Sequence, residues 1–182
     1  MALQFTTSYL EDSLAVLRYY KTQAERAIAQ VADDRLFVAL DPESNSIGIL
    51  VKHMAGNMRS RWTDFLTTDG EKPNRNRDSE FIEPPASRAE LMQMWDEGWD
   101  LTLQSLGGLS EADLVKTITI RGEAHSVMQA INRQIAHYTF HIGQIVMMAK
   151  HLSHENWTAL TIPRNQSNSY NQQVKEKKAS QR

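Results

Sequence analysis

The scarcity of residues that interrupt helices is the feature that most limits what this chain can fold into. The sequence of 182 residues holds only 8 glycines and 5 prolines, and these residues cluster. Because glycine and proline interrupt helices more strongly than other residues, the stretches between the clusters can each form one unbroken helix. The distribution predicts an all-α fold, a four-helix bundle.

Apolar residues recur at helical spacing in four of these stretches. In the first, Leu10, Leu14 and Leu17 lie on one helix face, since neighbours on a face recur every three or four residues. Ser87 and Glu90 have the spacing of a capping box, which places the start of the third helix at Ser87. The predicted helices cover roughly residues 6–32, 44–68, 87–106 and 126–152.

Two connections differ from short turns. Residues 70–85 contain three prolines, several charges and little periodicity, which indicates a long crossover connection between the second and third helices. Residues 114–120 alternate in polarity and predict a short extended segment before the last helix, with a turn at Arg121 and Gly122. We expect one bundle domain over residues 1–171 and a polar, disordered tail over 172–182.

Composition narrows the classes of function. The formal net charge is −2, so no strong overall attraction to nucleic acid or to an anionic membrane follows. No apolar run reaches the roughly 20 residues that span a bilayer, and the first residues lack a signal-peptide pattern, so we expect a cytoplasmic protein. The chain has no cysteine, which excludes disulfides and thiolate metal sites, so any metal ligands must be His, Asp or Glu.

The histidines at positions 53, 137 and 141 suggest a metal site. His137 and His141 are four residues apart, so their rings project from one face of the fourth predicted helix and can bind one ion together. Two ligands are too few for a tight site, and His53, in the middle of the second predicted helix, is the best third ligand. The alternative is that these histidines are core residues whose nitrogens bond to neighbouring groups.

Other polar residues of these two helices are weaker candidates. Gln144 lies one turn beyond His141 on the same stripe, so it ranks first for a supporting or substrate-binding role. Asn57, Tyr138 and Arg133 are further candidates, although packing or solvation explains Asn57 and Tyr138 better.

No acid–base residue accompanies the histidines, and the glutamate of an HExxH motif is absent. The mixed charges in and just after the crossover, Arg75, Arg77 and Glu80 among them, are interpreted as solvated surface. Trp62, Trp95 and Trp99 are expected to be core residues.

Three parts of the sequence resemble one known family. Residues 45–62, NSIGILVKHMAGNMRSRW, and residues 132–144, NRQIAHYTFHIGQ, look like the second and fourth helices of the DinB/YfiT-like metalloenzyme superfamily. Residues 157–163 and 169–171 are similar to the ending of one uncharacterised branch. The resemblance covers about residues 6–171. It implies a four-helix bundle, frequently a homodimer, in which His53, His137 and His141 bind a divalent metal, zinc or nickel.

The resemblance also implies a class of function. Characterised members conjugate or isomerise substrates with low-molecular-weight thiols, and others are known as DNA-damage-inducible proteins. We therefore expect a metal-dependent enzyme of the transferase or hydrolase class that activates a thiol cosubstrate or water and acts on a small-molecule substrate. The alternative is a non-catalytic, dimeric bundle of stress-response type that binds a metal or a ligand. DNA binding finds no support in the net charge.

Overall fold

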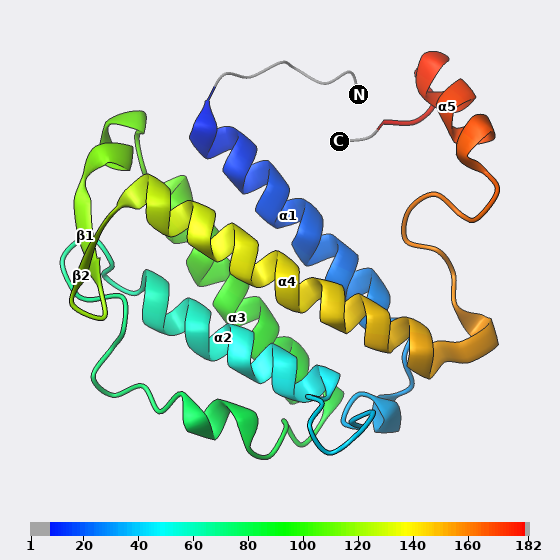
Figure 1. The fold of residues 1–182 in the computed structure, drawn as a ribbon, viewed down its shortest axis with the longest axis horizontal. Helices are drawn as coiled ribbons and strands as arrows, with labels where there is room; N and C mark the ends of the chain where they lie inside the picture. Colours follow the sequence, from blue (N-terminus) through cyan, green and yellow to red (C-terminus); the bar gives the residue numbers. More distant parts are fainter. Residues whose placement is uncertain (1–7, 181–182) are drawn as a thin grey trace.

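The structure, a computed structural model, describes residues 8–180 and confirms the all-α prediction. Figure 1 shows the long helices side by side in one bundle. Within residues 8–180, no helix is both long and apolar enough to cross a membrane. The helices are α1 (Tyr9–Ile28), α2 (Ile47–Trp62), α3 (Arg88–Gly107), α4 (Val127–Ser153) and the short α5 (Ser167–Lys175). Short 3-10 helices lie at Asp33–Arg35, Asp78–Phe81, Glu111–Val115 and His154–Asn156.

A serine begins each of the four long helices. Every one of these side chains accepts a hydrogen bond from the backbone N–H three residues further on, which satisfies an N–H that has no partner inside the helix. The caps are Ser8, Ser46, Ser87 and Ser126. The predicted start at Ser87 is confirmed, and the predicted start near residue 6 lies outside the described residues.

The second helix is shorter than the sequence predicts. It ends at Trp62 and not near residue 68, because Thr63 has extended backbone (ψ 120°) and Asp64 has a φ of +47°. The chain turns back here, and Phe65 packs its ring edge-on against Trp62, with the ring centroids 5.1 Å apart. The apolar pattern beyond Trp62 therefore continues the core without continuing the helix.

The crossover connection is confirmed and has a topological cause. Helices α2 and α3 run in the same direction, and residues 63–87 carry the chain back along α2 (Figure 1). A helix of 16 residues is about 24 Å long. Two consecutive parallel helices therefore need a long connection between them. The 3-10 helix Asp78–Phe81 of this crossover packs against α2.

The extended segment before α4 is an antiparallel hairpin of strands β1 (Thr117–Ile120) and β2 (Glu123–Ser126). Ile118 and Ile120 are buried, as the alternating polarity predicts. Strand β2 was not predicted, because its sequence, Glu-Ala-His-Ser, lacks residues with high β propensity and gains its conformation from pairing with β1.

The crossover and the hairpin are tied together at Asp69 and Gly70. The backbone N–H of Gly70 donates to the carbonyl oxygen of Thr119 at 2.8 Å. The Asp69 carboxylate accepts from the backbone N–H groups of Arg121 and Gly122, each at 2.8 Å. These bonds fix the hairpin beside the C-terminal end of α2.

Tryptophans join three of the helices in the core, as the sequence predicts. Trp62, Trp95 and Trp99 are at most 1 % exposed. The indole N–H of Trp62 donates to the Tyr138 hydroxyl at 3.0 Å, and the rings of Tyr138 and Trp99 lie 5.7 Å apart. Because replacing such a residue by alanine costs about 3–5 kcal/mol, these contacts hold α2, α3 and α4 in a fixed arrangement.

The last helix, α5, extends into the segment that the sequence predicts to be a polar, disordered tail. Helix α5 covers Ser167–Lys175 and therefore includes the first residues of the segment 172–182. It has no buried residue, and a hydrogen bond between the side chains of Gln172 and Glu176, 2.8 Å long, supports its last turn. The division into a bundle domain over 1–171 and a tail stays a prediction.

Candidate metal centre

Helices α2 and α4 bring three histidines to one point. His53 lies on α2, and His137 and His141 lie one turn apart on α4. The Nε2 atom of His137 is 3.3 Å from that of His53 and 3.1 Å from that of His141. All three ligand atoms lie within 4.8 Å of one another. Among residues 8–180 this is the group of side chains that could hold a metal ion.

The spacing of the three nitrogens fits a single ion. Metal–nitrogen bonds near 2.0–2.1 Å in a tetrahedral site place the nitrogens about 3.3 Å apart. The distances from His137 Nε2 to the other two Nε2 atoms, 3.1 and 3.3 Å, agree with that value. Three imidazole ligands leave at least one coordination position for water or substrate, which is the pattern of a catalytic zinc site.

Hydrogen bonds on the outer nitrogens orient two of the rings. The Nδ1–H of His53 donates to Glu80 Oε2, and the Nδ1–H of His141 donates to Gln144 Oε1, each at 2.8 Å. With the proton on Nδ1, the lone pair of each Nε2 points toward the other histidines. Converging lone pairs repel one another and favour a cation between them. Gln144 thus takes the supporting position that the sequence predicts.

Glu80 is a buried carboxylate that the crossover brings to His53. The Nε and Nη2 atoms of Arg75 donate to its two oxygens at 2.8 and 2.9 Å. Burial acts to raise the pKa of Glu80, but hydrogen bonds from His53 and Arg75 outweigh burial and hold the pKa below its usual range. Glu80 is therefore an anion, and it orients His53 in the way that outer carboxylates orient metal-binding histidines.

The interpretation of the crossover charges as solvated surface is wrong for Arg75 and Glu80. Their side chains are only 6 % and 8 % exposed, because the 3-10 helix Asp78–Phe81 packs against α2. One residue in the sequence indicates that the Glu80 side chain lies against α2, and it is the glycine at position 56. A Cβ at Gly56 would lie 2.7 Å from the carboxyl carbon of Glu80, so only glycine leaves room for the carboxylate.

The two histidines of α4 are neutral at pH 7. Burial, together with the proximity of the other two histidines and of nearby arginines, lowers the pKa of His137 to about 3. Burial also lowers the pKa of His141. Neutral imidazoles are the form that binds metal. The remaining nitrogen of His137, Nδ1, is buried and has no hydrogen-bond partner within the described part of the chain.

The three histidines open onto a cavity of about 590 Å³, which we call the histidine cavity. It lies between α2, α4, the crossover and the hairpin turn. Asn57 and Arg133, two of the weaker candidates from the sequence, line it, whereas Tyr138 is buried in the core. The other lining residues are Asn45, Arg61, Arg75, Arg77, Phe81, Arg121, Gln134, Phe140 and Gln144.

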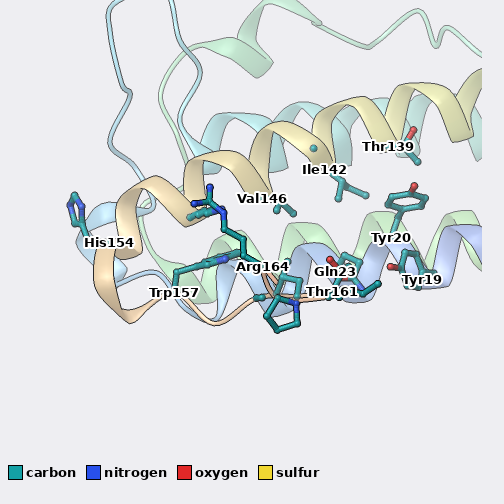
Figure 2. Close-up of a pocket in the computed structure, with 16 residues that line it drawn as sticks. Tyr19, Tyr20, Gln23, Thr139, Ile142, Val146, His154, Trp157, Thr161 and Arg164 are labelled. Atoms are coloured by element: carbon teal, nitrogen blue, oxygen red, sulfur yellow. The ribbon is translucent and has the colours of Figure 1, made fainter. Parts of the chain in front are cut away.

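A larger cavity, of about 870 Å³, lies on the opposite face of α4. We call it the tyrosine cavity, after Tyr19 and Tyr20 of α1. Figure 2 shows these two residues with Ile142 and Val146 of α4, and with Trp157 of the segment that follows α4. None of its lining residues belongs to the three-histidine group found in residues 8–180.

Comparison with known proteins shows which family the chain belongs to, and the function of that family is unknown. The model of a family described as "Protein of unknown function (DUF1572)" matches residues 4–166. The matched range contains all three histidines and the two residues that orient them. No curated protein matches the chain.

Proposed function

We propose that this chain, which belongs to the DUF1572 family of proteins of unknown function, is a metal-dependent enzyme with one divalent ion on His53, His137 and His141. The observation that carries the proposal is the convergence of three imidazole Nε2 atoms at the wall of a cavity. A closed structural site surrounds its ion with four protein ligands, whereas three ligands leave room for a substrate. Zinc and nickel are the proposed ions, since imidazole suits both.

The proposed reaction belongs to the transferase or hydrolase class. A bound ion would supply Lewis-acid chemistry, which lowers the pKa of a coordinated water or thiol. Because the chain has no cysteine, a thiol has to come from a cosubstrate of low molecular weight. Glu80 and Gln144 hold two of the imidazoles in place. The ring of Phe81, 4.6 Å from that of His53, covers one side of the site.

The relation to the DinB/YfiT-like superfamily is part of the same proposal. Its support is a bundle in which the second and fourth long helices supply the histidines.

A homodimer is also proposed, and its support is the exposure of two apolar side chains of α4. Phe140 and Met147 are 65 % and 55 % exposed and lie two turns apart on one face of the helix. A second copy of the chain would cover these side chains. Nucleic acid is not proposed as a partner, given the net charge of −2.

One observation favours a second candidate, a non-catalytic bundle that binds a metal or a ligand. No aspartate or glutamate is among the described residues that line the histidine cavity. Glu80, the nearest carboxylate, is held by His53 and Arg75. A general base must reach the proton that it removes, and Glu80 is not free to do so.

Turnover by the metal-loaded protein separates the two candidates. The full chain, loaded with zinc or nickel, is screened for conjugation of small thiols to electrophiles and for hydrolysis of esters and amides. His137→Ala is the test variant, and Thr139→Ala, on the opposite face of α4, is the matched control. Turnover that His137→Ala reduces at least 100-fold and Thr139→Ala keeps supports the enzyme. Turnover by His137→Ala that equals turnover by wild type contradicts the metal-dependent enzyme. Bound metal without any turnover favours the non-catalytic bundle.

A further inference from the structure

The histidine cavity concentrates positive charge in a chain whose formal net charge is −2. Its arginines come from α2, the crossover, the hairpin turn and α4, so four separate parts of the chain converge. Such a concentration of like charge attracts anions into a cleft. The five arginines are Arg61, Arg75, Arg77, Arg121 and Arg133.

Three of these arginines have partners inside the protein. Arg75 is held by Glu80 and by Glu71, which accepts from its Nη1 at 3.0 Å. The Nε of Arg121 lies 3.4 Å from Glu71, and the guanidinium of Arg77 stacks 4.9 Å from the ring centre of Phe81. Their charges are therefore offset or shared before any ligand binds.

Arg61 differs from these three. It lies in the last turn of α2 and is only 4 % exposed. Its Nε and Nη1 atoms are buried without a hydrogen-bond partner anywhere in residues 8–180. Burial lowers the pKa of its guanidinium, yet an arginine stays charged in a protein. Glu71 and Asp69 interact with this charge through space, but they accept no hydrogen bond from Nε or Nη1. Buried N–H groups without an acceptor destabilise the fold, so their position at a cavity wall points to a ligand.

The surroundings of Arg61 are shaped to hold its guanidinium at the cavity. A Cβ at Gly70 would lie 2.6 Å from Arg61 Nη1, so glycine at this position lets the guanidinium lie against the crossover backbone. Asn57, one turn before Arg61, and Gln134, on the facing helix, are 6 % and 2 % exposed and line the same cavity. The side-chain oxygen of each is also buried and unpartnered among the described residues. These two oxygens are hydrogen-bond acceptors, so they suit an N–H or O–H group of a ligand and not its anionic end.

We propose that Arg61 binds an oxyanion of the substrate, a carboxylate or a phosphate. The planar guanidinium presents paired N–H groups that match either anion. The inference rests on the proposed function, because it assumes that the reacting end of the same substrate lies at the three histidines. Arg61 lies two turns beyond His53, about 12 Å along the helix axis. The substrate is therefore a small molecule with its oxyanion several bonds from its reacting atom.

Anion binding to the metal-free full chain tests the proposal. Inorganic phosphate and succinate, each up to ~20 mM, are titrated by calorimetry into wild type, Arg61→Met and Arg59→Met, a range that saturates a site with a dissociation constant of about 1 mM. Arg59 is the matched control, because it lies on the same helix with a side chain 65 % exposed and pairs with Glu97 outside the histidine cavity. We expect Arg61→Met to weaken binding at least tenfold and Arg59→Met to leave it unchanged. Tighter binding of phosphate or of succinate identifies the anion. Equal binding by Arg61→Met, or no binding of either anion by wild type, overturns the proposal.

Thermal unfolding separates a binding role of Arg61 from a structural one. Without anion, the melting temperature of Arg61→Met should equal or exceed that of wild type, because the substitution removes buried N–H groups that have no acceptor. Phosphate or succinate should raise the melting temperature of wild type and not that of Arg61→Met. Two results together would contradict the proposal: a lower melting temperature of Arg61→Met than of wild type, and no rise in the melting temperature of wild type when either anion is added. If Arg61→Met does not fold, Gly70→Ala displaces the guanidinium while keeping its charge, and should weaken anion binding by a similar factor.

Metal analysis of the same samples keeps this proposal apart from the metal proposal. Arg61→Met should hold as much metal as wild type, because Arg61 is not among the three ligands. His137→Ala should lose the metal and still bind the anion with unchanged affinity. Anion binding lost in both variants would overturn the separate oxyanion subsite, whereas wild type that binds anion but no metal would overturn only the metal proposal.

Discussion

The histidine cavity and the tyrosine cavity share helix α4, which presents His137 and His141 to one and Ile142 and Val146 to the other. The tyrosine cavity is the larger, about 870 Å³ against about 590 Å³. Size therefore does not distinguish a functional site here. The chemistry of the walls does, since converging ligand atoms are found in the smaller cavity only, within the part of the chain that is described.

Buried polar atoms that lack a partner make the same distinction. Asn57, Arg61, Gln134 and His137 carry such atoms and line the histidine cavity, whereas Gln23 is the residue of this kind that lines the tyrosine cavity among residues 8–180. Each unpartnered atom costs about 1–3 kcal/mol. A group of them around one cavity indicates that ligands complete their bonding, whereas a single one gives no such indication.

The largest expected effect concerns stabilisation by metal. Zinc at 1,000 times its dissociation constant should raise the melting temperature of wild type by about 10 °C, the shift that about 4 kcal/mol gives a chain of this size. His137→Ala should abolish the rise, because two histidines bind too weakly. Thr139→Ala, in the wall of the tyrosine cavity, should keep it. Circular dichroism with and without zinc measures the difference, and an equal rise in both variants would break the comparison.

The next effect concerns the residue that orients His53. Glu80→Gln keeps the shape of the side chain and removes its charge, so metal affinity should fall about 10- to 100-fold. Glu97→Gln, at an exposed position of α3, is the carboxylate control. Competition with a chromophoric chelator gives both dissociation constants. An unchanged affinity in Glu80→Gln would show that the buried carboxylate serves only to neutralise Arg75.

A smaller effect is expected in the tyrosine cavity. Gln23→Met removes a buried oxygen that has no partner in the described structure, so the melting temperature should rise by about 3 °C, equivalent to about 1 kcal/mol. Metal affinity should not change, since Gln23 lies on the other side of α4. A lower melting temperature together with weaker metal binding would mean that the two cavities are coupled.

The smallest effect concerns the hairpin wall of the histidine cavity. Hydrogen bonds from the backbone N–H groups of Glu71 and Gly122 lower the pKa of Asp69 below its ordinary value of 3.8. A lowered folded-state pKa stabilises the fold above about pH 4, and the contribution is lost as the pH falls through the folded value. Asp69→Asn should therefore lower the melting temperature by about 2 °C at pH 7. The gap between the two proteins should narrow as the pH falls below about 4, and a gap that widens there would contradict the assignment.

The helical part of the fold was predictable because its signals are local. Serine caps, apolar spacing and the run Gly107-Gly108 mark helix ends within a few residues of where they lie. The early end of α2 was not predictable, since Phe65 continues the apolar pattern although the backbone leaves the helix at Thr63 and Asp64. Strand β2 depends on pairing with β1, which a reading of local propensity does not contain.

The candidate site was predictable only in the part that lies on helices. Helical spacing places His137 beside His141, and bundle packing suggests His53, but their mutual distances depend on the tertiary contact between α2 and α4. Glu80 and Arg61 escaped prediction for the same physical reason. The crossover has no periodicity that would locate Glu80, and the charge of Arg61 gives no sign that its partner is missing. The sequence signals of these contacts are two glycines, Gly56 beside Glu80 and Gly70 beside Arg61, where a Cβ would meet the neighbouring side chain.

The metal content of the purified chain tests the central claim most directly. Protein made without an affinity tag and without chelator is analysed by plasma mass spectrometry, beside the triple variant in which His53, His137 and His141 are alanine. The account predicts about one zinc or nickel ion per chain in wild type and none in the triple variant, the stoichiometry of one three-histidine site. Wild type that stays free of metal after incubation with either ion, or a triple variant that keeps an equal amount, would contradict it.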